Sequence, residues 1–88
     1  MASKKSDKDL SLAEAFGQTV RSYRERVGLT QDKLAFHVGI TPGYMSQIER
    51  GLTNVTLPIL WNVARVVGVK AGDLVRETEK KVPTKVRE

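Results

Sequence analysis

The sequence predicts an all-α fold, a compact bundle of about five short helices, because helix start and stop signals recur along most of the chain. Three threonines each stand directly after one apolar residue and four positions before another, the hydrophobic-staple arrangement of a helix N-terminus. Glycines follow the expected helix ends, where a left-handed residue often terminates a helix. No segment shows the apolar/polar alternation of a half-buried strand. The three threonines are Thr30, Thr41 and Thr56.

The first helix is expected to begin after Ser11 and to end near Gly28. Ser11 and Glu14 have the spacing of a capping box, in which each side chain accepts a hydrogen bond from the other residue's backbone N–H. Apolar residues at helical spacing then form the face that we expect to enter the core: Leu12, Phe16, Val20, Tyr23 and Val27.

Prolines and glycines delimit the later helices. Pro42 fits the first position of the third helix and Pro58 the first turn of the fourth, because backbone N–H groups have no intrahelical partner there. Gly51 and Gly68 are expected to close these two helices. A short fifth helix is expected around Ala71–Val75.

The chain is expected to form one helix-turn-helix domain, residues 11–75, between two polar segments. Residues 1–10 are rich in lysine and are expected to form a flexible N-terminal arm. Residues 76–88 carry charge, a proline and few apolar side chains, which predicts a disordered tail.

Composition excludes several classes of protein. The chain has no cysteine and one histidine, so we expect no disulfide, no metal site and no cofactor. No catalytic constellation or glycine-rich phosphate loop is present, so we expect neither an enzyme nor a small-molecule ligand. No apolar run reaches the length of a membrane span, which favours a cytoplasmic location without membrane contact. The net charge of +5 is compatible with a polyanionic partner.

Residues 28–51 carry the pattern of a helix-turn-helix. Gly39 falls where the turn between the two helices needs a residue that tolerates positive φ. Ala35 is small, as a close crossing of the two helices requires. Because such a unit lays its second helix in the major groove, double-stranded DNA is the expected partner. Inward-facing apolar residues come from both helices: Leu34, Ala35, Val38, Met45 and Ile48.

The second helix of this unit, residues 42–50, has a short polar outer face that suits contact with base edges. The amide of Gln47 matches the bidentate pairing with adenine, and the hydroxyl of Ser46 can pair with most bases. Arg50 lies one turn further along, where it could reach a phosphate or a guanine. The candidate base-reading residues are Pro42, Gly43, Ser46, Gln47 and Arg50.

Residues 12–75 resemble the phage-repressor helix-turn-helix family, the lambda repressor, Cro and Xre type. The resemblance is carried by G-L-T-Q-x-x-L-A-x-x-V-G-I-T-x-x-Y-M-S-Q-I-E-R-G and by N-x-T-L-x-x-L-x-x-V-A-R-x-x-G-V. It implies a lambda-repressor-like domain of five helices that binds operator DNA as a homodimer and regulates transcription. Small stand-alone regulators of this kind include restriction–modification controllers, Cro-like repressors and antitoxins.

The resemblance also implies roles for single residues. Gln31 matches the family's phosphate-binding glutamine, and it begins a helix whose free N–H groups and dipole attract an anion. Asn54 matches a loop position that touches the sugar-phosphate backbone. The candidate phosphate ligands are Thr30, Gln31, Tyr44 and Asn54.

Glu49 and Arg24 match a structural acid and its arginine partner in the first helix. Periodicity alone leaves Glu49 open as a solvated acid or as half of a partly buried pair, and the resemblance favours the pair. One departure from the family concerns Pro42 and Gly43, which stand where relatives often carry polar base-reading side chains. Apolar contact with a thymine methyl, or readout of DNA shape, could take the place of those side chains.

The fourth helix, residues 57–67, is apolar over a wider arc than a single core contact requires. It is therefore either central in the bundle or part of a subunit interface, and we favour the interface because a small domain cannot easily surround a helix. The residues expected in this homodimer interface are Ile59, Val63, Val66, Val69, Leu74 and Val75.

An alternative function is an antitoxin-type or protein-interaction module that keeps the fold and acts mainly through a protein partner. The presence of Gln31, Gln47 and Arg50 argues against this alternative. RNA polymerase or another regulatory protein is a candidate further partner, since Asp32 would lie beside the DNA-facing surface.

Overall fold

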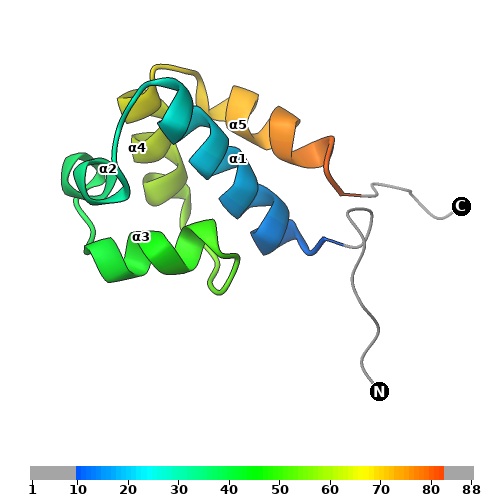
Figure 1. Ribbon diagram of the computed structural model, residues 1–88. Coiled ribbons are helices and arrows are strands. Elements are labelled where there is room, and N and C mark those ends of the chain that lie inside the picture. The colour runs from blue at the N-terminus through cyan, green and yellow to red at the C-terminus, as the bar shows by residue number, and fades with distance from the viewer. Residues whose placement is uncertain (1–9, 83–88) are drawn as a thin grey trace, which may run out of the picture.

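A computed structural model describes residues 10–82 of the chain and confirms the all-α prediction for that range, with five helices and no strand (Figure 1). All five helices expected from the sequence are present. Their bounds are α1 Leu12–Arg26, α2 Gln31–Val38, α3 Pro42–Glu49, α4 Leu57–Val67 and α5 Ala71–Glu79.

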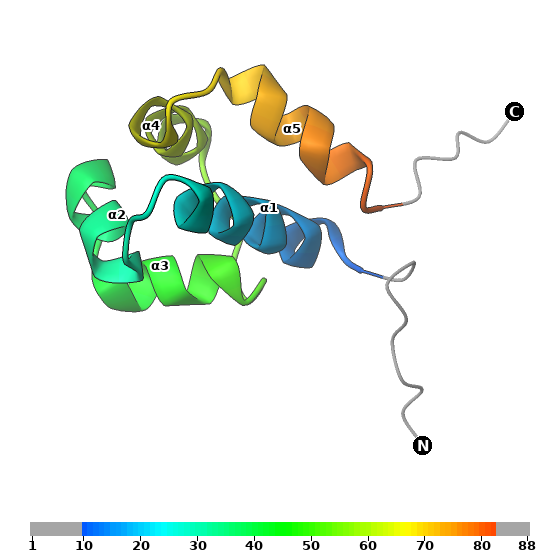
Figure 2. The ribbon, with the colours of Figure 1, turned by 45° about the horizontal axis from the view of Figure 1, so that its top comes forward.

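The longest helix, α1, runs through the middle of the bundle and contacts α3 on one side and α4 and α5 on the other (Figure 2). The pair α2 and α3 forms the helix-turn-helix, and α2 also packs against α4. The largest fully buried apolar side chains come from all five helices: Val20, Leu34, Met45, Ile48, Val63 and Leu74. The core therefore fixes the position of α3 through both α1 and α2.

The expected N-terminal caps are present. Ser11 and Glu14 form the capping box at the start of α1. Thr30, Thr41 and Thr56 each accept a hydrogen bond from the backbone N–H three residues later, at 3.1, 3.1 and 3.4 Å. Each threonine thus satisfies one of the backbone donors that a helix start leaves unpaired.

The first four helices end in the same way. The glycine that follows each helix has φ between +75° and +91°, a conformation that side chains other than glycine rarely adopt. At the end of α3, the Leu52 N–H donates to the Gln47 carbonyl at 2.9 Å and the Gly51 N–H to the Ile48 carbonyl at 3.0 Å. This Schellman arrangement stops α3 directly after its last outward-facing residues.

The fifth helix is longer than predicted. It continues from the expected end at Val75 to Glu79, so the boundary of the expected tail at residue 76 falls inside α5. The added turn buries Thr78, whose hydroxyl lies 3.3 Å from that of Thr19 on α1. An apolar pattern cannot detect two buried threonines. The remainder of the expected tail, residues 83–88, and residues 1–9 of the expected arm lie outside the described residues.

The buried face of α1 also differs from the predicted stripe. Phe16 and Val20 are buried as expected, whereas Leu12 and Val27 at the two ends of the stripe are exposed. Ala15 and Thr19 are buried in their place. The stripe of α1 was therefore correct in its centre and wrong at its ends.

Gly17 sets the closest approach between α1 and α3. A Cβ atom at this position would lie 2.3 Å from the Ile48 carbonyl oxygen and 2.6 Å from that of Glu49. These contacts are with backbone atoms, which cannot rotate away as a side chain could. The last turn of α3 therefore rests directly on the backbone of α1.

We predict that Gly17→Ala lowers the free energy of unfolding by about 2–3 kcal/mol, because the added methyl group forces α1 and α3 apart. Gly72→Ala is the matched control, because a Cβ atom in α5 would meet nothing closer than 4.0 Å. That control should be neutral or slightly stabilising. Urea unfolding measures both changes, and equal midpoints for the two variants would contradict the close packing at Gly17.

Candidate nucleic-acid interface

The outer face of α3 is free of other helices along its length (Figures 1 and 2). Met45, Ile48 and Glu49 are buried on the inner face. Pro42, Gly43, Gln47 and Arg50 are exposed and Ser46 is half-buried, which is the division expected from the helical wheel. The candidate base-reading residues therefore share one accessible surface, although their contacts with bases remain a prediction.

A hydrogen-bonded ion pair fixes the inner side of this surface. The Arg24 guanidinium donates from Nε to Glu49 Oε2 at 2.6 Å and from Nη2 to Oε1 at 3.0 Å. Only 11% of the Arg24 side chain and 3% of the Glu49 side chain are exposed. The hydrogen bonds to Glu49 raise the pKa of Arg24 above its ordinary value, so the guanidinium stays charged. The expected ion pair is therefore present, and it joins α1 to the last residue of α3.

Two further hydrogen bonds complete the surroundings of this pair. Arg24 Nη1 donates to the Leu29 carbonyl at 2.9 Å, in the turn between α1 and α2. Gln31 Nε2 donates to Glu49 Oε1 at 3.0 Å. The bond from Gln31 was not predicted, because it joins residues 18 positions apart and has no local sequence signal. Arg24, Gln31 and Glu49 thus connect three helices.

The N-terminus of α2 lies beside this cluster and carries two of the candidate phosphate ligands. The Thr30 oxygen accepts the N–H of Lys33, which leaves its own hydroxyl hydrogen available as a donor. Gln31 uses one amide hydrogen on Glu49 and keeps the second. Both side chains can therefore hold their places in the fold and still donate to an anion.

Tyr44 makes a hydrogen bond within the fold, and its expected phosphate contact stays a prediction. Its hydroxyl donates to the Asn54 carbonyl at 3.3 Å and so connects α3 to the loop before α4. A phosphate oxygen is only an acceptor, and a phenol has a single hydrogen to donate. Tyr44 supports the loop in this arrangement and would have to give up this bond in order to donate to a phosphate. The exposed Asn54 side chain is a further candidate phosphate ligand.

The expected dimer interface is only partly accessible. Val63 and Leu74 were wrong as interface residues, because both are fully buried in the core of the single chain. The helical wheel could not show which side of α4 or α5 is covered by other helices. Ile59, Val66 and Val69 are half-buried and Val75 is exposed, so these four remain candidates.

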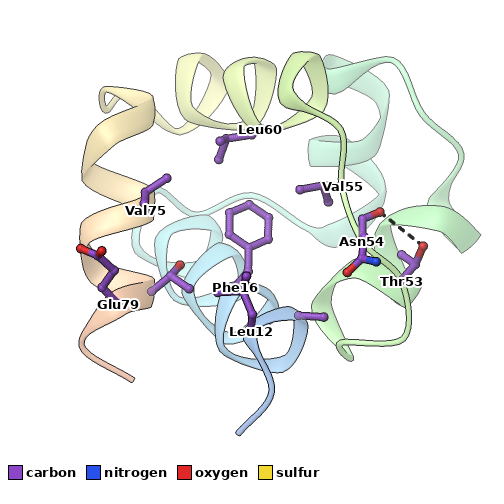
Figure 3. Close-up of a pocket in the computed structure, with 10 residues that line it drawn as sticks. Leu12, Phe16, Thr53, Asn54, Val55, Leu60, Val75 and Glu79 are labelled. Carbon is purple, nitrogen blue, oxygen red and sulfur yellow. Dashed lines mark hydrogen bonds between the residues drawn. The ribbon is translucent and has the colours of Figure 1, made fainter. Parts of the chain in front are cut away.

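The most exposed apolar side chains of α4 were not among the predicted interface residues. Leu57 is 68% exposed and Trp61 is 62% exposed, one helical turn apart. A separate apolar cavity of about 370 Å³ lies between α1, α4, α5 and the loop before α4, and neither Leu57 nor Trp61 lines it (Figure 3). Its apolar lining includes Leu12, Phe16, Val55, Leu60 and Val75.

Two other features are absent from residues 10–82. No group of three or more His, Cys, Asp or Glu side chains in that range could hold a metal ion. None of its helices combines the length and apolar character that crossing a bilayer would require.

We predict that Arg24→Ala lowers the free energy of unfolding by about 3–5 kcal/mol, because it leaves the Glu49 carboxylate buried without its cation. Arg21→Ala is the matched control, since its ion pair with Glu25 on the same helix is exposed. That control should change stability by less than about 1 kcal/mol. Similar unfolding midpoints in urea for the two variants would show that the buried pair does not stabilise the fold in this way.

Comparison with known proteins identifies the family. The sequence profile of the helix-turn-helix domain matches residues 15–78. Control protein C.BamHI of Bacillus amyloliquefaciens is 40% identical over 60 residues, which cover 67% of this chain and 74% of that protein.

Solved structures give the same result. The clp gene regulator ClgR from Corynebacterium glutamicum is 34% identical, with a TM-score of 0.78 over 81% of this chain and 76% of that chain. The biofilm regulator SinR, solved in complex with DNA, is 34% identical with a TM-score of 0.64 over 68% of this chain and 97% of that chain. The chain therefore belongs to the helix-turn-helix family, in the lambda-repressor-like, Xre-type group that its sequence resembles.

Proposed function

We propose that this protein is a sequence-specific transcriptional regulator that binds operator DNA as a homodimer, with α3 in the major groove. The observation that carries the proposal is the division of α3 into a buried inner face and an outer face that carries Gln47 and Arg50. The likeness to SinR, which was solved in complex with DNA, supports this use of the fold.

The rigid attachment of α3 supports base readout. Base recognition requires side chains to be held in a fixed geometry, because a misplaced amide loses its bidentate pairing. The Arg24–Glu49 pair, the contact at Gly17 and the Tyr44 hydrogen bond all restrain α3 from its inner side. Gln47 would then read adenine, while Arg50 would contact a guanine or a phosphate at the edge of the site.

Phosphate contacts would set the register of the protein on DNA. The free hydrogens of Thr30 and Gln31 and the N-terminus of α2 form one group of donors. Asn54, in the loop that Tyr44 supports, is a second candidate contact, at the other end of the helix-turn-helix. These contacts would be shared by all DNA sequences, whereas α3 would distinguish among them.

The homodimer would form through α4 and α5. Leu57 and Trp61 on α4 and Val75 on α5 expose apolar surface, and the two helices pack against each other. A partly exposed tryptophan is a common anchor of protein interfaces. A second copy is the occupant that fits the function, because one recognition helix reads too few base pairs for specific binding.

In vitro selection of bound duplexes from a random library tests the central proposal. We expect a two-fold symmetric consensus, with half-sites about one helical turn, roughly 34 Å, apart. Recovery of sequences without any consensus would contradict sequence-specific regulation by this protein.

We predict that Gln47→Ala weakens binding to the selected operator by about 1–3 kcal/mol and relaxes the preference at one position of each half-site. Gln31→Ala is the contrasting variant, because loss of a phosphate contact should weaken binding to all duplexes to a similar extent. Mobility shifts with operators that carry single base changes distinguish the two. An equal loss on every duplex for Gln47→Ala would remove this residue from base readout.

We predict that Trp61→Glu and Val75→Glu each yield folded monomers that bind the operator weakly, because a charge would be buried in the dimer interface. The control is Phe36→Glu on α2, where an equally apolar side chain is 79% exposed but lies on another helix. Analytical ultracentrifugation measures the oligomeric state and circular dichroism the fold. If both α4–α5 variants stay dimeric while Phe36→Glu becomes monomeric, the interface lies on α2.

A further inference from the structure

Two of the seven glycines in the chain lie where the fold itself would accept a residue with a side chain. Four others have positive φ, and Gly17 has no room for a side chain. A Cβ atom at Gly43 would have no neighbour within 4 Å, and one at Gly72 would meet only the end of the Arg76 side chain at 4.0 Å. Neither of these two glycines has positive φ.

Gly43 is the one that lies on the DNA-facing surface. It is the second residue of α3 and is exposed, one helical turn before Gln47 on the same side. The start of α3 does not depend on it, because the Thr41 side chain caps the helix and Pro42 occupies the first position. The first turn of α3 therefore presents the Pro42 ring and bare backbone where another residue would fit without a clash.

A surface of this kind permits a closer approach than a helix with side chains. At Gly43 a chemical group that faces α3 can approach the helix backbone more closely, by the space that a methyl side chain would occupy. The Pro42 ring beside it is apolar and carries no N–H. The partner that fits the Pro42 ring is a small apolar group, since a base donor or acceptor packed against that ring would lose its hydrogen bond with water.

Among the groups on the major-groove edges of base pairs, the thymine C5 methyl is the apolar one. We propose that Gly43, together with Pro42, reads a thymine by packing against its methyl group, so that the absence of a side chain determines specificity at that position. This inference rests on the proposed function, because it requires α3 to enter the major groove.

The test exchanges a methyl group between protein and DNA. In the selected operator, each thymine is replaced singly by deoxyuridine, which removes the C5 methyl and leaves base pairing unchanged. For the wild-type protein, one replacement per half-site should weaken binding about fourfold, the value of one buried methyl group.

Gly43→Ala supplies the missing methyl from the protein side. It should bind the thymine operator about tenfold more weakly than the wild type, the size of a lost base contact. At the same deoxyuridine position the preference should invert, so that Gly43→Ala binds the uracil operator more tightly than the thymine operator. Binding of Gly43→Ala to a non-specific duplex should equal that of the wild type.

Gly72→Ala, the equivalent change at the second residue of α5, is the folding control. Both variants should melt at or above the wild-type temperature, because neither added methyl group clashes and alanine favours a helix. Two results would overturn the inference. One is that Gly43→Ala binds the thymine operator with an affinity within twofold of the wild type. The other is that the loss of affinity of Gly43→Ala persists whichever thymine is replaced by deoxyuridine. In either case a selected consensus still supports the proposed function, whereas failure to select any consensus removes the proposed function itself.

Discussion

The ion pair between Arg24 and Glu49 is the interaction on which the geometry of the recognition surface depends. Removing two charges from water is unfavourable. Their mutual attraction offsets this desolvation cost only where their remaining hydrogen-bonding groups are also satisfied. Here Arg24 also donates to the Leu29 carbonyl, and Glu49 also accepts from Gln31. The pair therefore contributes less to the net free energy of folding than to the selection of a single arrangement of the helices. The two charges are satisfied only when α1, α2 and α3 are placed in this way.

A steric constraint acts together with this electrostatic one. The last turn of α3 rests on the backbone at Gly17, one residue after the buried Phe16. The same turn carries Glu49, whose side chain reaches Arg24. A shift of α3 along α1 would lengthen the ion pair, and a shift toward α1 is blocked by backbone atoms. The outer face of α3 is consequently held from the opposite side.

Local signals were sufficient to predict most of the fold. Thr30, Thr41 and Thr56 cap helices as expected, since a cap depends only on the few residues around it. The predictions that failed involve contacts between helices. The longer α5 buries Thr78 beside Thr19 of α1, and Val63 and Leu74 proved to belong to the core rather than to an interface. The candidate DNA surface was accessible to sequence reasoning because helical periodicity separates its residues from the core within one helix, whereas the bond from Gln31 to Glu49 depends on tertiary structure.

The proposed DNA-binding surface and the proposed dimer interface lie on different helices, and this separation has an energetic consequence. In the proposed dimer, Leu57 and Trp61 would leave water only on association, so the apolar area that a monomer exposes becomes the driving force for pairing. Each recognition helix alone would bind weakly, but in a dimer the second half-site is engaged as an intramolecular step at high effective concentration. Occupancy of an operator would then rise more steeply than in proportion to protein concentration. Residues of α4 and α5 that touch no base would thereby control DNA affinity as strongly as those of α3.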